Sequence, residues 1–263
     1  MKILFIGDIV GKSARIKVKE KISFIKNKYS PDVVIANAEN ATGGYGLSKN
    51  DAKDLLDSGL DVLTLGNHAW DQREMLTFIE ECPRIVRPIN YPNGVPGKGY
   101  YTLNLINGKK IVIVQVMLRL FMGMFLDDPF KSIKKFLLTE KLGSTCDSIF
   151  IDVHGEATSE KCAFGHYVDG AVSAVLGTHT HIPTSDDKIL PKGSAYQTDV
   201  GMTGDYNSVI GMDIENPIHG FTKGFRGEGR FTPAKGDITI CGTLVETNDN
   251  NGLAKNITTI QEK

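Results

Sequence analysis

Several features that mark specialised protein classes are scarce in this sequence. Its four cysteines (Cys82, Cys146, Cys162 and Cys241) are scattered over 263 residues without a CxxC spacing. This pattern argues against a disulfide framework or a cysteine zinc site, and it favours reduced thiols in a cytoplasmic protein. The sequence also lacks any apolar run near the roughly 20 residues that cross a bilayer, so we expect no membrane partner.

The sequence also has no excess of positive or negative charge. The formal net charge is −1 at pH 7 and the isoelectric point is near 6.6, which gives no basic footprint for nucleic acid. With 41% hydrophobic and 23% charged residues, the composition is that of a globular protein, and we expect one domain over residues 1–263. The short apolar start is followed at once by Gly7 and Asp8, which indicates a first strand rather than a signal peptide.

The first third of the chain alternates apolar runs with helical segments. The apolar runs lie at residues 2–7, 33–36 and 62–65, and helices are expected at about 13–28, 48–59 and 71–81. Uniformly apolar strands separated by helices predict a parallel sheet that helices cover. In such sheets, functional residues gather beyond the carboxyl ends of the strands.

The rest of the chain is richer in strands. The dipeptide Asn107-Gly108 predicts a hairpin turn between strands at 100–106 and 109–117. Asp128 and Pro129 are typical of a helix start, as the N-cap and the first helical residue. Further strands are expected at 148–153, 171–176, 194–198, 237–246 and 253–260. The glycine- and charge-rich segment 216–235 shows little periodicity, and we expect a long, mobile loop there.

The sequence Gly-Thr-His-Thr-His at 177–181 follows the apolar run 171–176. Side chains alternate between faces on an extended segment, so we expect His179 and His181 to point the same way. Two imidazoles on one side of a strand end suit a metal ion. An isolated pair of this kind is more often one exposed and one hydrogen-bonded histidine, so its weight depends on the other strand ends.

Polar groups with metal-ligand chemistry follow the other apolar strands too. The candidate ligands are Asp8, Glu39, Asn40, Asn67, His154, His179 and His181. Carboxylate, carboxamide and imidazole together favour Mn, Fe or Zn over Ca. Seven groups are too many for one tetrahedral ion, but they suit two ions with Glu39 as the bridge. Two ions about 3.5–4 Å apart can activate water and neutralise a phosphate ester.

Each of these residues also has an ordinary structural interpretation. Asp8 could cap a helix, Asn40 and Asn67 could stabilise turns, and His154 could be a hydrogen-bonded core histidine. What favours a metal centre is that such residues follow five different strands. His68, next to Asn67, could protonate a leaving-group oxygen or donate a hydrogen bond to a phosphate oxygen.

These residues resemble the metal-binding blocks of calcineurin-like metallophosphoesterases. The resemblance rests on Gly7-Asp8, on Gly-Asn-His at 66–68 and on the motif at 177–181. The usual Asp-x-His block is Asp8-Ile9-Val10 here, and the usual Gly-Asp block is Ala38-Glu39-Asn40. With the segments at 66–71, 87–92, 154–161 and 198–204, these departures resemble the YmdB-type subfamily over nearly the whole chain.

The resemblance implies a fold, an activity and a set of roles. The fold would be an α/β four-layer sandwich, with two mixed β-sheets flanked by helices. One ion would take Asp8, Glu39, Asn40 and His181, the other Glu39, Asn67, His154 and His179, and His68 would be the catalytic acid. The ions would be Fe or Mn, with Zn or Mg as alternatives, and Asn40 would compensate for the histidine missing at Val10.

The leading hypothesis is therefore a phosphodiesterase that acts on 2′,3′-cyclic or 3′,5′-cyclic nucleotides through attack of a metal-bound hydroxide. A phosphomonoesterase such as a nucleotidase is the first alternative, and a slow-turnover regulatory protein that binds nucleotides is the second. Aromatic residues in the segments 43–46 and 221–231 could contact a base or could be ordinary packing. The sequence leaves open whether the chain forms a homo-oligomer.

Overall fold

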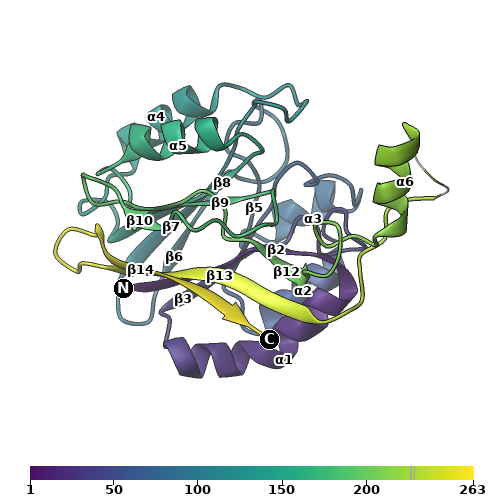
Figure 1. Cartoon of the computed structure of the whole chain (residues 1–263). Helices are drawn as coiled ribbons and strands as arrows, with labels where there is room; N and C mark the ends of the chain where they lie inside the picture. The colour runs from purple at the N-terminus through teal and green to yellow at the C-terminus, as the bar shows by residue number, and fades with distance from the viewer. Residues whose placement is uncertain (226, 228) are drawn as a thin grey trace.

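The apolar runs near the N-terminus form the parallel centre of the first of two mixed sheets in the computed structural model (Figure 1). The model describes residues 1–225, 227 and 229–263. The strands of this sheet, named sheet A, are β1 (Lys2–Ile6), β2 (Asp8–Ile9), β3 (Val33–Asn37), β4 (Val62–Thr64), β5 (Ile85–Val86), β12 (Met202–Asp205), β13 (Ile238–Thr247) and β14 (Ala254–Glu262). Their order is β2-β12-β13-β1-β3-β4-β5, with β14 paired to β13.

Sheet B contains the hairpin expected at Asn107-Gly108. Its strands are β6 (Tyr100–Asn104), β7 (Lys110–Met117), β8 (Ser148–His154), β9 (Ala174–Thr178), β10 (Lys188–Ile189) and β11 (Ala195–Gln197). Their order is β10-β11-β9-β8-β7-β6. Strands β7, β8 and β9 run parallel, whereas β6 pairs antiparallel with β7.

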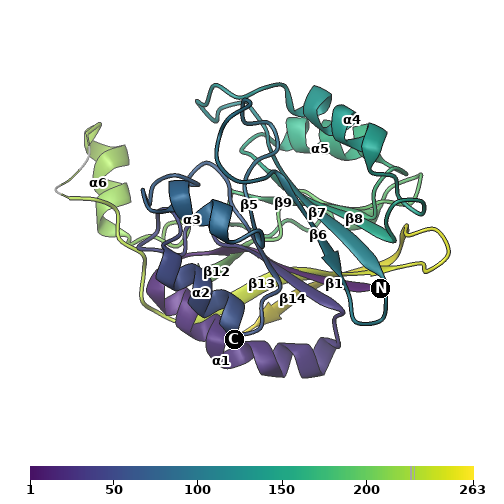
Figure 2. The same ribbon diagram turned by 180° about the vertical axis from the view of Figure 1, so that it is seen from behind.

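Helices cover the outer face of each sheet, as Figures 1 and 2 show from opposite sides. The helices are α1 (Gly11–Tyr29), α2 (Lys49–Asp57), α3 (Met75–Glu81), α4 (Pro129–Thr139), α5 (Thr158–Val168) and α6 (Glu215–Lys223). The first three share a hydrophobic core with sheet A, and α4 and α5 share one with sheet B. The expected four-layer sandwich with two mixed sheets is thereby confirmed.

A third core lies between the two sheets, because the central strands are apolar on both faces. Along β1, Leu4 and Ile6 pack toward the helices, whereas Ile3 and Phe5 pack toward sheet B. The rings of Phe5 and Phe150 mark this contact, with centroids 4.9 Å apart. Side chains that alternate along the strands therefore bury both faces of sheet A, and the two sheets pack face to face. This packing fixes where the carboxyl ends of the strands in the two sheets lie relative to each other.

Local capping signals account for two helix starts. The side chain of Asp128 accepts hydrogen bonds from the backbone N–H groups of Phe130 and Lys131, and Pro129 is the first residue of α4. The hydroxyl of Ser48 accepts a bond from the N–H of Asp51 at the start of α2. Both contacts satisfy backbone donors that have no partner inside the helix.

The expectation of a long loop over residues 216–235 is wrong for its first part, where α6 forms. The Asp213 carboxylate accepts the N–H of Glu215, the buried Pro217 favours the first turn, and Gly224 ends the helix at φ 75°. These are capping signals, which a search for hydrophobic periodicity does not detect. Residues 226 and 228 of that segment lie outside the described residues.

Helix α6 projects from the side of the sandwich (Figure 1). Across the part of the chain that the structure describes, no helix has both the length and the apolar character that a membrane span requires. The four cysteines are all free thiols, as the sequence predicts.

Candidate metal centre

The candidate ligands lie at the carboxyl ends of strands from both sheets. Sheet A supplies Asp8 just after β1, Glu39 two residues after β3, and Asn67 after β4. Sheet B supplies His154 as the last residue of β8 and His179 directly after β9. The contact between the sheets is therefore what brings these side chains together.

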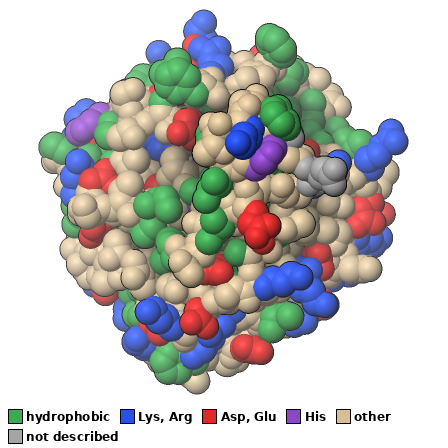
Figure 3. Space-filling model, turned by 45° about the vertical axis from the view of Figure 1, so that its right-hand side comes forward, with side chains coloured by type: hydrophobic (Ala, Val, Ile, Leu, Met, Phe, Trp, Pro, Cys, Tyr) green, Lys and Arg blue, Asp and Glu red, His purple; other side chains and the backbone are tan. Residues whose placement is uncertain are grey.

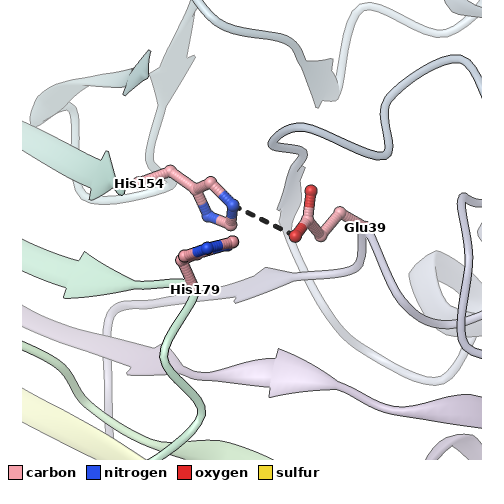
Figure 4. Close-up of side chains that lie close together, drawn as sticks. All are labelled: Glu39, His154 and His179. Carbon is pink, nitrogen blue, oxygen red and sulfur yellow. Dashed lines mark ion pairs between the residues drawn. The ribbon is translucent and has the colours of Figure 1, made fainter. Parts of the chain in front are cut away.

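Glu39, His154 and His179 form the centre of this arrangement (Figure 4). One ligand atom from each lies within 4.8 Å of the others. Glu39 Oε1 is 3.1 Å from His154 Nε2, and the two imidazole rings meet edge to face with centroids 4.9 Å apart. Asn67 Oδ1 joins them, 2.9 Å from His154 Nε2.

The carboxylate of Glu39 is held from two sides. Its side chain is 1% exposed, and its Oε2 accepts the backbone N–H of His68 at 2.9 Å. The backbone N–H of Glu39 donates to Asn37 Oδ1 at 3.0 Å, which fixes the start of the segment after β3. The Glu39 carboxylate therefore contacts sheet B at His154. It also contacts the segment after β4, at the backbone of His68.

A second group lies around Asp8. Its Oδ2 accepts the backbone N–H of His179 at 3.2 Å, whereas its buried Oδ1 has no hydrogen-bond partner. His181 Nε2 is 3.9 Å from that Oδ1, which is too far for a hydrogen bond. Asn40 is similar, because its Nδ2 donates to Gly44 O at 3.0 Å and its buried Oδ1 has no partner.

The expectation that residues 179–181 continue as an extended strand is wrong. Strand β9 ends at Thr178, and His179 and His181 have φ angles of 98° and 67°. Such left-handed backbone is uncommon outside glycine and requires support from neighbouring contacts. The turn directs His179 toward Glu39 and His154, and His181 toward Asp8, so the two imidazoles belong to different groups.

Hydrogen bonds fix which nitrogen of each imidazole carries a proton. The single hydroxyl proton of Thr178 is donated to Asp152 Oδ1 at 2.6 Å, so Thr178 Oγ1 accepts from His154 Nδ1 at 2.9 Å. His181 Nδ1 likewise donates to the carbonyl of Ile210 at 2.7 Å. In their neutral forms, both rings therefore present an unprotonated Nε2, which is the form that binds a metal.

Asp152 connects both sheets underneath this centre. Its Oδ2 accepts from Asn37 Nδ2 at 3.0 Å and from the Thr64 hydroxyl at 2.6 Å, both in sheet A. Burial raises its pKa and outweighs the opposite effects of His154 and of these donors. The motifs at the strand ends do not include Asp152, although a carboxylate within an apolar strand is a signal for such a role.

The pKa shifts follow from burial and from the neighbouring charges. Burial raises the pKa of Asp8 to about 6 despite the nearby His181 and His154. Burial would raise the pKa of Glu39, but the charge and hydrogen bond of His154 outweigh it and lower that pKa. Glu39 in turn raises the pKa of His154 against the effect of burial. Burial and the charge of His154 lower the pKa of His179 to about 3, so its imidazole is neutral near pH 7.

Three features show that these residues suit bound cations. The buried oxygens Asp8 Oδ1 and Asn40 Oδ1 lack hydrogen-bond partners. The donor set combines carboxylate, carboxamide and imidazole groups, which suits transition-metal ions. At Gly66 an added Cβ would lie 2.4 Å from Glu39 Oε2 and 2.5 Å from His154 Nε2, so the missing side chain leaves the centre open there.

His68 lies beside this centre with its ring held by two neighbours. Its Nδ1 is 2.8 Å from Asp71 Oδ2, and its side chain is 27% exposed. The ring meets Tyr45 edge to face, with centroids 5.2 Å apart. Because a carboxylate only accepts, Nδ1 carries the proton of that bond, which leaves Nε2 as the nitrogen that can exchange a proton with a ligand.

A buried ion pair supports the turn that carries His179 and His181. Lys161 Nζ donates to the carbonyl of Thr178 at 2.6 Å and lies 3.1 Å from Asp199 Oδ2, and both side chains are 0% exposed. The same Asp199 oxygen accepts the backbone N–H and the hydroxyl of Thr180, at 3.0 and 2.8 Å. The pair therefore contacts the residue before His179 and the residue after it.

Replacing Lys161 with Met should destabilise the protein strongly. The change leaves Asp199 as a buried charge without its cation, which typically costs about 3–5 kcal/mol of unfolding free energy. Urea unfolding of Lys161→Met, compared with the unchanged protein, measures the effect. The matched control is Lys19→Met, because Lys19 pairs with Asp54 at the surface, where both side chains are about half exposed. That control should change stability by about 0–1 kcal/mol, and similar effects of the two substitutions would contradict the prediction.

Comparisons with known proteins agree on one family. The family model described as YmdB-like protein matches residues 4–260 of the chain. A relative from Bacillus subtilis (strain 168), named 2′,3′-cyclic-nucleotide 2′-phosphodiesterase, is 47% identical over 249 residues, which cover 95% of this chain and 92% of the relative.

Two solved structures agree with the fold. The crystal structure of a novel phosphatase from Mycoplasma pneumoniae has a TM-score of 0.92 and 35% identity, and the match covers 100% of this chain and 93% of that one. The calcineurin-like phosphoesterase YfkN from Bacillus subtilis has a TM-score of 0.57 and 14% identity, with 100% and 90% of the two chains covered. The second likeness concerns the fold alone.

Proposed function

The chain belongs to the YmdB-like family, and on that premise we propose that it is a metal-dependent phosphodiesterase that hydrolyses cyclic nucleotides. The observation that carries this proposal is the close grouping of Glu39, His154 and His179, whose ligand atoms lie within 4.8 Å of one another. A catalytic histidine candidate, His68, is joined to the same Glu39 through its backbone N–H. We propose further that residues 1–263 form one phosphoesterase domain and that the protein acts in the cytoplasm.

Two ions fit the two groups of ligands. Asp8, Glu39, Asn40 and His181 would hold one, and Glu39, Asn67, His154 and His179 would hold the other. When bound, such ions lower the pKa of water and offset the negative charge of a phosphate ester. We propose Fe or Mn, because imidazole, carboxylate and carboxamide ligands together match these ions. Glu39 is the residue that the two sets share.

The protein's own residues supply orientation and a proton. Thr178 and Ile210 hold Nδ1 of His154 and His181, so that Nε2 of each ring faces the centre. Asp71 holds Nδ1 of His68, and in the doubly protonated ring the Nε2–H is the proton that His68 would give to the leaving ribose oxygen. Protonation matters because a ribose alkoxide is a poor leaving group.

The activity itself is the first test. Protein that has been stripped with EDTA should be inactive, and protein reloaded with Mn²⁺ or Fe²⁺ should open 2′,3′-cyclic AMP to a nucleoside monophosphate. The control substrates are the matching monoesters, 2′-AMP and 3′-AMP. Faster release of phosphate from these monoesters would instead indicate a phosphomonoesterase. Tight nucleotide binding without turnover under any metal would indicate a regulatory binding protein.

A further inference from the structure

A cavity of about 430 Å³ lies beside His68. It is lined by Tyr45, His68, Asp71, Gly229, Arg230 and Phe231. This volume lies in the range of about 300–1,000 Å³ that is typical of small-molecule sites. None of the seven candidate metal ligands is among the described residues that line it, so the cavity adjoins the metal centre without being part of it.

His68 is the residue that joins the cavity to the centre. Its backbone N–H donates to Glu39 Oε2 at 2.9 Å, and its side chain lines the cavity. A phosphate that lies at the metal centre close enough to receive a proton from His68 therefore has the cavity next to it. The group that is attached to the phosphate on that side therefore lies next to the cavity.

Two aromatic side chains from distant segments form walls of the cavity. Tyr45 comes from the glycine-rich loop before α2, and Phe231 comes from the segment after α6. Both pack against one small hydrophobic cluster made of Val10, Met202 and Met212. The two aromatic side chains therefore rest on the same three residues.

The loop that carries Tyr45 is pressed closely against the opposite segment. An added Cβ at Gly44, where φ is +89°, would lie 3.0 Å from Met212 Cε and 3.1 Å from Pro233 Cγ. Gly44 therefore allows an approach that a larger residue would obstruct. The loop that carries Tyr45 and the segment that carries Pro233 therefore pack closely against each other.

The chemistry of the lining suits a planar group that is attached to an anion. Tyr45 and Phe231 offer aromatic faces, and the exposed Arg230 adds a positive charge at the same cavity. Aromatic side chains bind nucleobases by stacking, and Arg can add a cation–π contact. A short alkyl group would gain little from this combination.

A second hydrophobic region lies nearby and has a different character. Figure 3 shows hydrophobic side chains next to basic side chains and a histidine on the face that carries α6. Phe221 and Phe225 are 87% and 65% exposed there. Both line a second cavity, which shares Phe231 with the first but, among the described residues, contains neither His68 nor Tyr45. This region supplies a matched aromatic residue for a control.

We propose that the cavity beside His68 is the nucleoside subsite, with the base of the substrate against Tyr45 and Phe231 and its phosphate at the metal centre. The inference rests on the proposed function and adds a substrate requirement to it. Because aromatic faces contact every base, the subsite selects for the presence of a base and distinguishes weakly between bases.

The test compares two substrates with the same reacting atoms. One is 2′,3′-cyclic AMP, and the other is methyl ribofuranoside 2′,3′-cyclic phosphate, which has a methyl group in place of the base. For the Mn²⁺-loaded protein, kcat/KM should be higher for the nucleotide. Phe231→Leu keeps an apolar side chain on the cluster but removes the ring, and it should lower the ratio of the two kcat/KM values roughly tenfold or more.

Three controls make the result specific. Phe231→Tyr keeps a ring and should restore the ratio, and Phe221→Leu on α6 should leave the ratio at its original value. Free adenosine should compete with 2′,3′-cyclic AMP for the unmodified protein, whereas ribose should not. This last measurement does not depend on the folding of any variant.

The outcomes separate the subsite from the activity. If the unmodified protein hydrolyses neither diester, the proposed function fails. If it hydrolyses both with equal kcat/KM, or if Phe231→Leu lowers both equally, the phosphodiesterase stands and the nucleoside subsite is overturned. Competition by ribose as strong as that by adenosine would overturn the subsite as well.

Discussion

Glu39→Gln should abolish measurable hydrolysis and reduce the metal content of the purified protein. Gln has nearly the same shape, and its carbonyl oxygen can still accept the N–H of His68. It lacks the negative charge that the proposed shared ligand provides beside His154. Loss of several kcal/mol of charge stabilisation corresponds to a decrease of about a thousandfold or more in kcat/KM. The measurements are kcat/KM on 2′,3′-cyclic AMP and bound metal by mass spectrometry.

The matched control is Glu81→Gln, the same change at an acid whose side chain is 61% exposed and paired with Lys49. It should leave both the rate and the metal content as they were. Circular dichroism of Glu39→Gln checks that the loss is not caused by unfolding. A folded Glu39→Gln variant with full metal content and full activity would rule out Glu39 as a shared ligand.

His68→Asn should lower kcat by roughly a hundredfold to ten-thousandfold on 2′,3′-cyclic AMP, the usual contribution of a general acid. The loss should depend on the leaving group. A ribose oxygen needs a proton as it departs, whereas p-nitrophenolate departs readily as an anion. With bis-p-nitrophenyl phosphate as the substrate, we therefore expect the same variant to lose about tenfold or less, and the ratio of the two losses is the decisive quantity.

His166→Asn is the control for this comparison, because His166 is an exposed histidine on α5. Its rates on both substrates should match those of the unmodified protein. An equal loss on both substrates for His68→Asn would show that His68 binds the phosphate and does not protonate the leaving oxygen. Metal content should stay unchanged in either case, since His68 is not among the candidate ligands.

Local patterns account for much of the fold that the sequence predicts correctly. The apolar runs around Leu4, Val34 and Leu63 form parallel neighbours because each is followed by a helix that returns the chain to the same edge. Asn107-Gly108 predicts the β6–β7 hairpin because the turn chemistry lies within those two residues. Such signals act over a few residues and are visible in a single sequence.

Pairing between distant segments is not visible in the same way. Strand β13 lies beside β1, with Leu244 opposite Leu4, and nothing in either apolar run specifies the other as its partner. The backbone at His179 and His181 is a similar case. Alternation along a strand predicts one direction for both rings, but tertiary contacts hold both residues at positive φ and direct the rings to different groups.

The sequence predicts which acids and histidines lie at the candidate site. It does not predict the residues that hold them in place. Each candidate ligand follows an apolar run, and the structure brings Glu39, Asn67, His154 and His179 together and places His181 near Asp8. Asp152, Lys161 and Asp199 hold these groups from inside the protein, and their partners come from several strands. Such roles depend on three-dimensional neighbours, so spacing in the sequence does not reveal them. The metal-ligand roles themselves stay predictions until ions are measured.

The central place of β1 in sheet A has a consequence for synthesis on the ribosome. Of the strands in sheet A, β1 comes first along the chain, yet one of its two neighbours, β13, begins at Ile238. At about 5–20 residues per second, roughly ten to fifty seconds pass before that neighbour exists. In the last part of that time, once His181 has been made, the nascent chain contains every candidate metal ligand, but one edge of β1 still has no partner. Nascent chains of this protein should therefore depend on chaperones or on slow collapse until the final hairpin emerges and covers that edge.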